Sequence, residues 1–368
     1  MAKNVVVCLD GTGNQLKATG NSNVLHLYGM LDLSDSSRQV AYYDPGVGTM
    51  GARGAWSTWG RKLTRGLGLA FGSGIKDNLE ESLTFLIQNY QPGDRVFIFG
   101  FSRGAFTARG LTGMIYRSGV MRPGAENLVP YLVAAYTKGD NFTEDDWTRL
   151  DRFASTFSVR TDGSLALPVH FLGLWDSVKA LGILRPDPKW PYTRQLPNAR
   201  HVFHAVSIDE RRRPYLEYLV RPSNAVETRE TWFAGVHSDI GGGFKDDPEL
   251  SRITLKWMTD RALDHGLLLD PGVYEEMCAV TAGHASGRIH PNGWIWGALT
   301  FRRRPIIVEN PLVHASVRSR MSLDPSYSLP RELSEVTWDD VDWLKPHPAA
   351  SGRRPSRISR SEDFEDPA

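Results

Sequence analysis

Short apolar runs alternate along the chain with segments of helical periodicity. Residues 5–9 (Val-Val-Val-Cys-Leu) are continuously apolar and mostly β-branched, which is typical of a strand buried on both faces. Further strands are predicted at residues 39–43, 95–99, 169–174 and 231–236, each followed by turn-forming or polar residues. Strands that alternate with helices indicate an α/β fold with a mostly parallel sheet and helices on both faces.

Two helices are predicted between these strands. The first carries apolar side chains three or four positions apart, on one helix face: Ile75, Leu79, Leu83, Leu86 and Tyr90. The turn sequence QPGD at residues 91–94 ends it. The second helix is rich in small residues and follows Gly104 to about Ser118.

Three regions interrupt the alternation. Residues 45–74 contain nine glycines and are too long for an ordinary connection, so we expect a functional or mobile insertion. Residues 119–167 are expected to be a mostly polar insertion with helical stretches. Residues 351–368 have almost no apolar side chains and are expected to be a disordered tail. We therefore expect residues 1–345 to form a single domain enlarged by the first two insertions.

The composition narrows the class of protein. Among 368 residues, 43 basic and 42 acidic side chains nearly cancel, which argues against a nucleic-acid-binding protein that relies on bulk charge. Apolar residues make up 41% of the chain, enough for a sizeable core. Cys8 and Cys278 are too few for a disulfide framework or a zinc cluster. The sequence shows neither a signal peptide nor an apolar stretch of membrane-spanning length, so we expect a cytoplasmic protein as synthesised.

The sharpest chemical signal is the sequence GFSRG at residues 100–104, directly after a predicted strand. A nucleophilic serine projects from a tight, strained turn between a strand and a helix. Glycines two positions before and after it let the two elements pass without a clash. The N-terminus of the following helix favours developing negative charge. The alternative is a glycine-rich turn without chemistry, but the strand–turn–helix context favours Ser102 as a nucleophile.

A nucleophilic serine needs a base, and the base needs an acid that fixes its tautomer. Asp176 and His237 each follow the end of a predicted strand, in the order serine, acid, histidine of α/β hydrolases. The carboxyl ends of parallel strands share one edge of a sheet, so Ser102, Asp176 and His237 would converge there. Three alternatives stay open: Asp176 caps a helix, His237 is an ordinary loop histidine, or Asp239 is the acid. His170 lies inside its strand and is assigned to the core.

An oxyanion hole needs two backbone N–H donors. Arg103, directly after the nucleophile, is expected to supply one, and Gly11 or Thr12, after the first strand, the other. This assignment puts the first strand in the place of the third strand of a full hydrolase sheet, without the two leading antiparallel strands.

Two other ligands compete for the same loops. The sequence GTGNQL at residues 11–16 could bind a phosphate, but Leu16 replaces a glycine of the dinucleotide fingerprint and the P-loop lysine is absent. Four side chains could hold a hard cation, although no spacing demands it: Asp10, Asp176, Asp239 and His237. We therefore expect no metal and no other cofactor.

Several motifs follow one another along the chain: LDGTGN (9–14), YYDPGVGT (42–49), GFSRGAFTARG (100–110), FLGLWDSV (171–178), SIDERR (207–212), AGVHSDIGGGF (234–244) and VHASVRSRM (313–321). Together they resemble one known family, the catalytic domain of the type VI secretion lipase effectors. The resemblance implies an α/β-hydrolase fold and a serine esterase of the phospholipase A type. By motif match, Ser102 would be its nucleophile, Asp176 its acid and His237 its base.

The resemblance also sets expectations about partners. It implies an ester or phospholipid substrate, contact with a membrane surface and export by a signal-independent secretion system. The well-studied effectors carry long membrane-anchoring modules, for which we expect no room in this chain. The alternatives are a non-lipid serine hydrolase, such as a thioesterase or peptidase, and a non-enzymatic or phosphate-binding α/β protein.

Local charge points towards lipid. Residues 45–74 carry four basic and no acidic side chains, among them Arg53 and Arg61, interleaved with Trp56 and Trp59. Such a segment suits a lid that touches an anionic lipid surface, and the alternative is a structural loop with buried tryptophans. A second aromatic and basic cluster at residues 294–304 is interpreted as a core strand with a solvated end.

Overall fold

The computed structural model describes residues 2–11, 19–46, 69–139, 142–161, 163–178, 189–212, 215–221, 226–291, 304 and 309–350. Its strands are β1 (Asn4–Leu9), β2 (Gln39–Asp44), β3 (Arg95–Phe101), β4 (Val169–Trp175), β5 (Ala199–Ser207), β6 (Glu227–Phe233), β7 (Leu312–His314) and β8 (Thr337–Asp339). Its α-helices are α1 (Asn23–Met30), α3 (Leu69–Asn89), α4 (Arg103–Ser118), α5 (Val129–Tyr136), α6 (Glu144–Phe157), α7 (His237–Gly241), α8 (Glu249–Asp264), α9 (Pro271–Cys278) and α11 (Ala315–Leu323). Short 3-10 helices are η1 (Glu126–Leu128), η3 (Ala282–Ser286), η4 (Arg331–Leu333) and η5 (Pro348–Ala350).

Within the described ranges, the strands form one eight-stranded sheet in the order β2-β1-β3-β4-β5-β6-β7-β8. All seven strand pairs are parallel. β1 lies between β2 and β3, with Cys8 opposite both Tyr43 and Phe99. The predicted α/β fold with a mostly parallel sheet is therefore confirmed.

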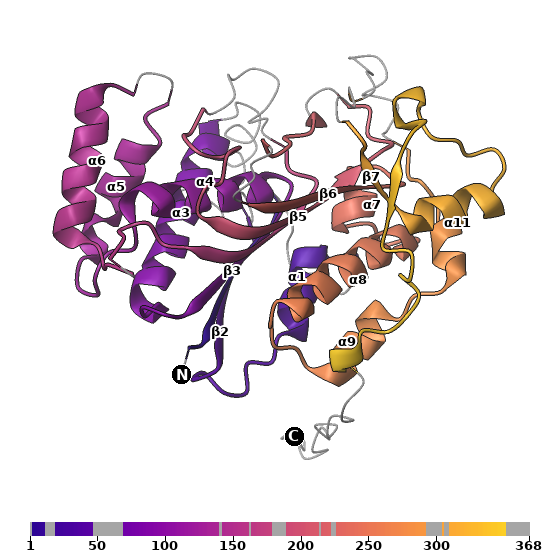
Figure 1. The fold of residues 1–368 in the computed structure, drawn as a ribbon, viewed down its shortest axis with the longest axis horizontal. Coiled ribbons are helices and arrows are strands. Elements are labelled where there is room, and N and C mark those ends of the chain that lie inside the picture. Colours follow the sequence, from indigo (N-terminus) through magenta and orange to yellow (C-terminus); the bar gives the residue numbers. More distant parts are fainter. Residues whose placement is uncertain are drawn as a thin grey trace, which may run out of the picture.

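Helices cover both faces of the sheet because each central strand is apolar on both sides. Val5 and Val7 of β1 belong to the core under α3 and α4, whereas Val6 and Cys8 belong to the core under α1 and α8. Figure 1 shows α3, α4, α5 and α6 together on one side of the strands and α1, α8 and α9 on the other. The apolar face predicted for α3 is buried in the first of these cores.

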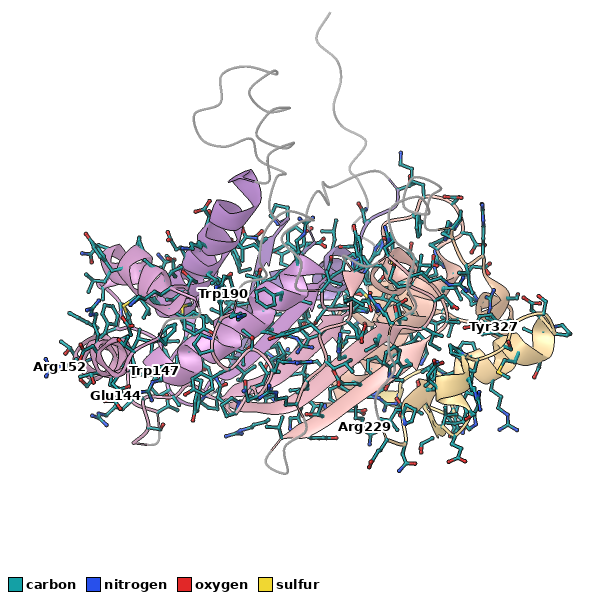
Figure 2. All side chains as sticks on the ribbon, turned by 90° about the horizontal axis from the view of Figure 1, so that it is seen from above. Glu144, Trp147, Arg152, Trp190, Arg229 and Tyr327 are labelled. Carbon is teal, nitrogen blue, oxygen red and sulfur yellow. The ribbon has the colours of Figure 1, made fainter. Side chains whose placement is uncertain are left out.

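The small residues of α4 let large aromatic side chains approach its backbone. A Cβ at Gly110 would lie 2.7 Å from the ring of Trp190, and a Cβ at Gly113 would lie 2.6 Å from the hydroxyl oxygen of Tyr136. Trp147 of α6 lies in the same half of the molecule as Trp190, and Tyr327 lies at the opposite end (Figure 2). The helical stretches expected in residues 119–167 are therefore α5 and α6, which pack against the core of this half.

Some boundaries differ from the sequence-based expectations. β5, β7 and β8 were not expected, and β6 begins at Glu227 instead of residue 231. The first four residues of β6 are all polar, which obscures the start of this strand, and β7 and β8 are too short to show a period. No helix in the described part of the chain is both long and apolar enough to cross a membrane.

Candidate active site

Ser102 occupies a strained turn between β3 and α4. Its backbone angles are φ 59° and ψ −122°, a region that residues with a side chain rarely adopt. A Cβ at Gly100 would lie 2.7 Å from the Cα of Ala105, and a Cβ at Gly104 would collide with the carbonyl oxygen of Leu9. Both glycines are therefore required for the close passage of β1, β3 and α4, as the GxSxG pattern predicts.

Ser102, His237 and Asp176 form a continuous chain of hydrogen bonds at the carboxyl edge of the sheet. Asp176 directly follows β4, and His237 opens α7 shortly after β6. Nδ1 of His237 lies 2.6 Å from Oδ2 of Asp176, and Nε2 lies 2.7 Å from Oγ of Ser102. Because a carboxylate only accepts, Nδ1 carries the proton, and Nε2 accepts the hydrogen bond from the serine hydroxyl.

Asp176 is completely buried and is held by an arginine from a distant part of the chain. Nη1 of Arg304 donates to Oδ1 at 2.6 Å and Nη2 donates to Oδ2 at 2.8 Å, while the amide of Ser207 donates to Oδ1 at 2.9 Å. Burial opposes ionisation of Asp176, but the charge of Arg304 and the hydrogen bonds from His237 and Arg304 outweigh it. The pKa of Asp176 therefore lies well below its usual range.

Burial and a second ion pair shape the surroundings of His237. Its ring lies 4.8 Å from the rings of Phe101 and Tyr215, between centroids. Its backbone amide donates to Oε2 of Glu210 at 3.2 Å, and Arg212 pairs with the same carboxylate at 2.7 Å. Burial lowers the pKa of His237 more than Asp176 and Glu210 raise it, so the ring is neutral at pH 7 and can accept a proton.

Of the residues expected to form an oxyanion hole, Arg103 and Gly11 are described. Arg103 is the first residue of α4, so its amide lies beside Ser102 at the positive end of the helix dipole. The amide of Gly11 donates to Oδ1 of Asp10 at 2.6 Å. Thr12 lies outside the described residues.

The structure separates the four side chains considered for a hard cation. Asp176 and His237 are hydrogen-bonded to each other, whereas Asp239 and Asp10 bind other partners. Asp239 sits in α7, where its Oδ1 binds Nδ1 of His290 at 2.6 Å and its Oδ2 accepts from the amide of Val236. Asp10 accepts hydrogen bonds from the hydroxyls of Ser22 and Tyr43. Asp239 therefore does not contact the ring of His237 as a competing acid.

Two further sets of residues were singled out from the sequence, the lid residues and the cluster at residues 294–304. Trp56, Trp59, Arg53 and Arg61, proposed for a lid, lie outside the described residues. The solvated end expected for residues 294–304 is wrong at Arg304, because its side chain is 2% exposed and binds Asp176.

Sequence reasoning missed three residues that hold the site together: Ser207, Glu210 and Arg304. The first two lie in the motif SIDERR, which starts at the last residue of β5, and this polar run would have been a usable signal only if β5 had been predicted. Gly241 adds a close contact, since a Cβ there would collide with the ring of Phe101. This explains the glycine at the last position of α7, the helical turn that His237 opens.

A parallel sheet covered on both faces, with a strained serine turn that meets histidine and aspartate at the strand ends, defines the α/β-hydrolase type of protein. Residues 3–261 match the family described as "T6SS, Phospholipase effector Tle1-like, catalytic domain". The match covers most of the chain, so the protein belongs to this Tle1-like phospholipase effector family, and the resemblance read from the motifs is confirmed.

Three individual proteins resemble the chain. The uncharacterized protein YEL023C of Saccharomyces cerevisiae is 36% identical over 230 residues, which cover 60% of this chain and 33% of that protein. A crystal structure of an uncharacterized protein from Pseudomonas aeruginosa has a TM-score of 0.43 at 20% identity, covering 77% of this chain and 48% of the other. A structure of the Tle1 effector bound to the VgrG spike has a TM-score of 0.37 at 20% identity, covering 66% and 51%. The chain thus spans about a third of the curated relative and about half of each solved structure.

Proposed function

We propose that the protein hydrolyses carboxylic ester bonds of phospholipids through an acyl-enzyme on Ser102, with His237 as general base and Asp176 as its acid partner. The observation that carries the proposal is the unbroken chain of short hydrogen bonds from Ser102 through His237 to Asp176. Membership of a phospholipase effector family supports phospholipid as the substrate class, and a membrane surface as the place where the enzyme meets it.

The protons have a defined route in this reaction. Nε2 of His237 takes the hydroxyl proton as Oγ of Ser102 attacks the ester carbonyl, and the carbonyl oxygen becomes an oxyanion. His237 then gives the proton to the leaving alcohol, which departs and leaves the acyl-serine. Water attacks the acyl-serine, with its proton passing to His237 and then back to Oγ of Ser102, and the fatty acid is released.

Backbone amides are the proposed oxyanion donors. The amide of Arg103 is the first, because it directly follows the nucleophile and opens α4. Gly11 donates to its neighbour Asp10 in this structure, so the amide of Thr12 is the better candidate for the second donor.

Arg304 is proposed as a positioning residue that acts through Asp176. Its guanidinium donates a hydrogen bond to each carboxylate oxygen of Asp176. This fixes the plane of the carboxylate and keeps Oδ2 directed at Nδ1 of His237. A fixed carboxylate in turn keeps the proton of His237 on Nδ1 and its Nε2 facing Ser102.

The test uses a fluorophosphonate probe and a panel of esters on the full chain. Wild-type protein is expected to be labelled at Ser102 and to hydrolyse p-nitrophenyl esters and phospholipid vesicles. The Ser102→Ala variant is expected to lose labelling and nearly all activity, because only the serine oxygen can form the acyl-enzyme. A residual rate of about 10³–10⁴ over the uncatalysed reaction is expected from the remaining site.

Ser155→Ala is the matched control, since Ser155 is exposed on α6 and donates only to the carbonyl of Arg152. It should be labelled and active like wild type. Labelling that persists in the Ser102→Ala variant would contradict the assignment of Ser102 as the nucleophile. If the wild-type protein is labelled and hydrolyses thioesters or peptides but not phospholipid vesicles, the proposed triad is supported and the proposed lipid substrate is contradicted.

A further inference from the structure

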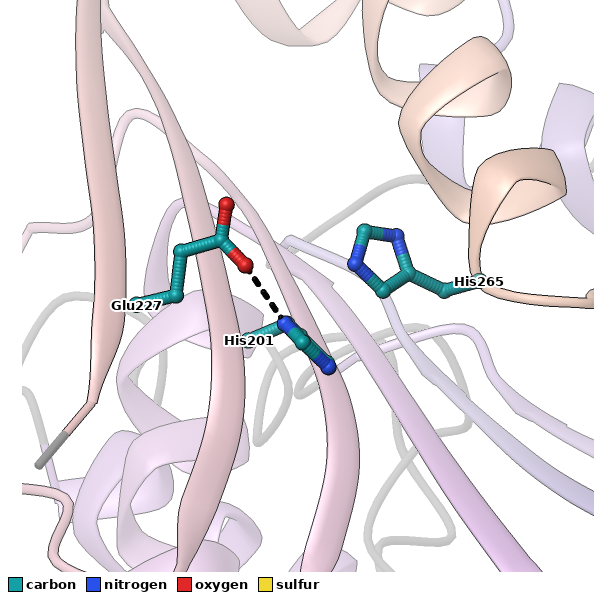
Figure 3. Close-up of side chains that lie close together, drawn as sticks. All are labelled: His201, Glu227 and His265. Carbon is teal, nitrogen blue, oxygen red and sulfur yellow. Dashed lines mark hydrogen bonds and ion pairs between the residues drawn. The ribbon is translucent and has the colours of Figure 1, made fainter.

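Two histidines and a glutamate meet at the edge of the sheet opposite to the candidate active site. His201 lies near the start of β5, Glu227 is the first residue of β6, and His265 caps the carboxyl end of α8. One nitrogen or oxygen of each side chain lies within 4.8 Å of the others. In Figure 3 the ring of His265 faces the pair formed by His201 and Glu227.

The strand register brings the first two side chains together. His201 and Glu227 are directly opposite each other in the parallel pair β5–β6. Nδ1 of His201 lies 2.7 Å from Oε2 of Glu227, and the ring centroids of His201 and His265 are 4.1 Å apart. The cluster is thus built from rigid elements, two paired strands and a helix end, which keep its groups close without a bound ligand.

Hydrogen bonds outside the cluster orient His265. Its Nδ1 donates to the carbonyl oxygen of Arg261 at 2.6 Å, so Nε2 of the neutral ring carries the free electron pair. A second bond comes from His170 on β4, whose Nε2 donates to the backbone carbonyl of His265 at 3.0 Å. A histidine held through one nitrogen by a backbone carbonyl, with the other nitrogen directed at neighbouring donors, is the arrangement found at metal ligands.

We propose that His201, Glu227 and His265 bind a divalent late first-row metal ion, with zinc as the best match. Two imidazole nitrogens and one carboxylate form the donor set of many three-ligand zinc sites, with water in the fourth position. Tetrahedral zinc with bonds of about 2.1 Å sets its ligands about 3.4 Å apart. The ligand atoms lie at most 4.8 Å apart, so a separation at that limit would close by about 1.4 Å to reach this spacing. The pair formed by Nδ1 of His201 and Oε2 of Glu227, at 2.7 Å, would instead open by about 0.7 Å.

Two of the three side chains of the cluster are open to solvent. The side chains of His201 and Glu227 are 27% and 45% exposed, so an ion can reach them from solvent. Arg229 approaches Oε1 of Glu227 at 3.8 Å, and both of these side chains are more than 40% exposed. Such an exposed pair contributes little, so the carboxylate is available to a metal.

The site lies far from the ester chemistry. Ser207, which donates to Asp176, lies six positions after His201 along β5, and at about 3.3 Å per residue this places the two sites about 20 Å apart. The bound ion would join β5, β6 and the end of α8, and would stabilise the folded chain without touching Ser102.

Metal binding is measured on the full chain without a histidine tag, after EDTA treatment and dialysis. Titration calorimetry with Zn²⁺ is expected to show one ion per chain, and Zn²⁺ is expected to raise the melting temperature. His265→Gln and Glu227→Gln each remove one ligand and should weaken Zn²⁺ binding by more than about tenfold. His284→Gln is the matched control, because His284 bonds only within the short helix η3 region and should leave binding unchanged.

A spectroscopic test of the metal ligands can be made on the wild-type protein, so it does not depend on whether the variants fold. Cu²⁺ bound to wild-type protein should show hyperfine coupling to two imidazole nitrogens by electron paramagnetic resonance. The proposal is overturned if Zn²⁺ does not bind at millimolar concentration, if the ligand variants bind it as wild type does, or if the spectrum lacks these two nitrogens. Each of these results leaves the serine chemistry unaffected, so failure here is distinct from failure of the proposed hydrolase.

Discussion

Replacing Arg304 by glutamine removes the cation that grips Asp176 and leaves a carboxylate with no exposure to water. Two hydrogen bonds to a charged group are lost, at 2.6 and 2.8 Å, each contributing about 1.5–3 kcal/mol. Removing one partner of a buried ion pair costs about 3–5 kcal/mol in comparable cases. The two routes agree, so we expect Arg304→Gln to lower the free energy of unfolding by about 3–5 kcal/mol. Arg304→Lys keeps the charge without the planar fork and should fall between glutamine and wild type.

Arg304→Gln should also shift the pH dependence of catalysis, and a purely structural role of Arg304 would not produce such a shift. The charge of Arg304 is one of the causes that lower the pKa of His237, so its removal raises that pKa. The acid side of the profile of kcat/KM against pH should therefore move to higher pH. A looser carboxylate should also reduce kcat, by up to about 100-fold, which is less than the loss of about 10⁴ expected when the acid itself becomes an amide.

Urea unfolding gives the stability change, and hydrolysis of a soluble p-nitrophenyl ester between pH 4 and pH 9 gives the profile. Arg320→Gln is the matched control, because Arg320 is also buried but donates to the carbonyls of Ala285 and Gly287. Arg320→Gln should lower the free energy of unfolding but should not shift the profile of kcat/KM against pH. A profile of Arg304→Gln that superimposes on that of wild type would refute the positioning role.

Two further predictions concern the turn and the histidine. Gly104→Ala should lower the free energy of unfolding by about 1–3 kcal/mol, measured with urea, and should reduce activity, because its Cβ would meet the carbonyl oxygens of Leu9 and Asp10. Gly29→Ala is the control, because a Cβ there has open space and should not destabilise the protein. His237 has a lowered pKa when folded, so between that value and the ordinary 6.5 the unfolded chain binds more protons. Stability should therefore fall as pH drops through this window, and His237→Gln should flatten the fall in unfolding experiments; an unchanged slope would contradict a buried neutral ring.

The central strands could be predicted from sequence because their apolar runs are continuous. β1 and β3 are buried along almost their whole length, and no polar residue breaks their pattern. β5 is just as central but was missed, since Arg200, His201 and His204 interrupt its apolar residues. His204 is nevertheless fully buried, with Nδ1 bound to Glu230 at 2.8 Å and Nε2 accepting from the amide of Ser177. From sequence alone, a histidine that is buried through partners on and beside neighbouring strands looks like a surface residue, because its partners are not known.

The serine, histidine and aspartate could be proposed as site residues from sequence because each follows a strand end with a local signal. Arg304 had none: it lies 128 residues beyond Asp176, in a basic run that resembles a solvated segment. Strand order also could not be derived, because pairing depends on contacts between faces rather than on any single run. Long-range ion pairs and sheet order are thus the parts of this molecule that local patterns do not encode.

The charges around His237 are arranged as two closed pairs. Arg304 neutralises Asp176, and Arg212 neutralises Glu210, whose carboxylate accepts from the amide of His237. A lone buried carboxylate beside the ring would raise its pKa, but each carboxylate here has its own cation, and burial becomes the largest influence on the ring. The imidazole therefore stays neutral and the carboxylate of Asp176 stays ionised, which are the protonation states that the proposed reaction needs in a base and in the group that stabilises its imidazolium.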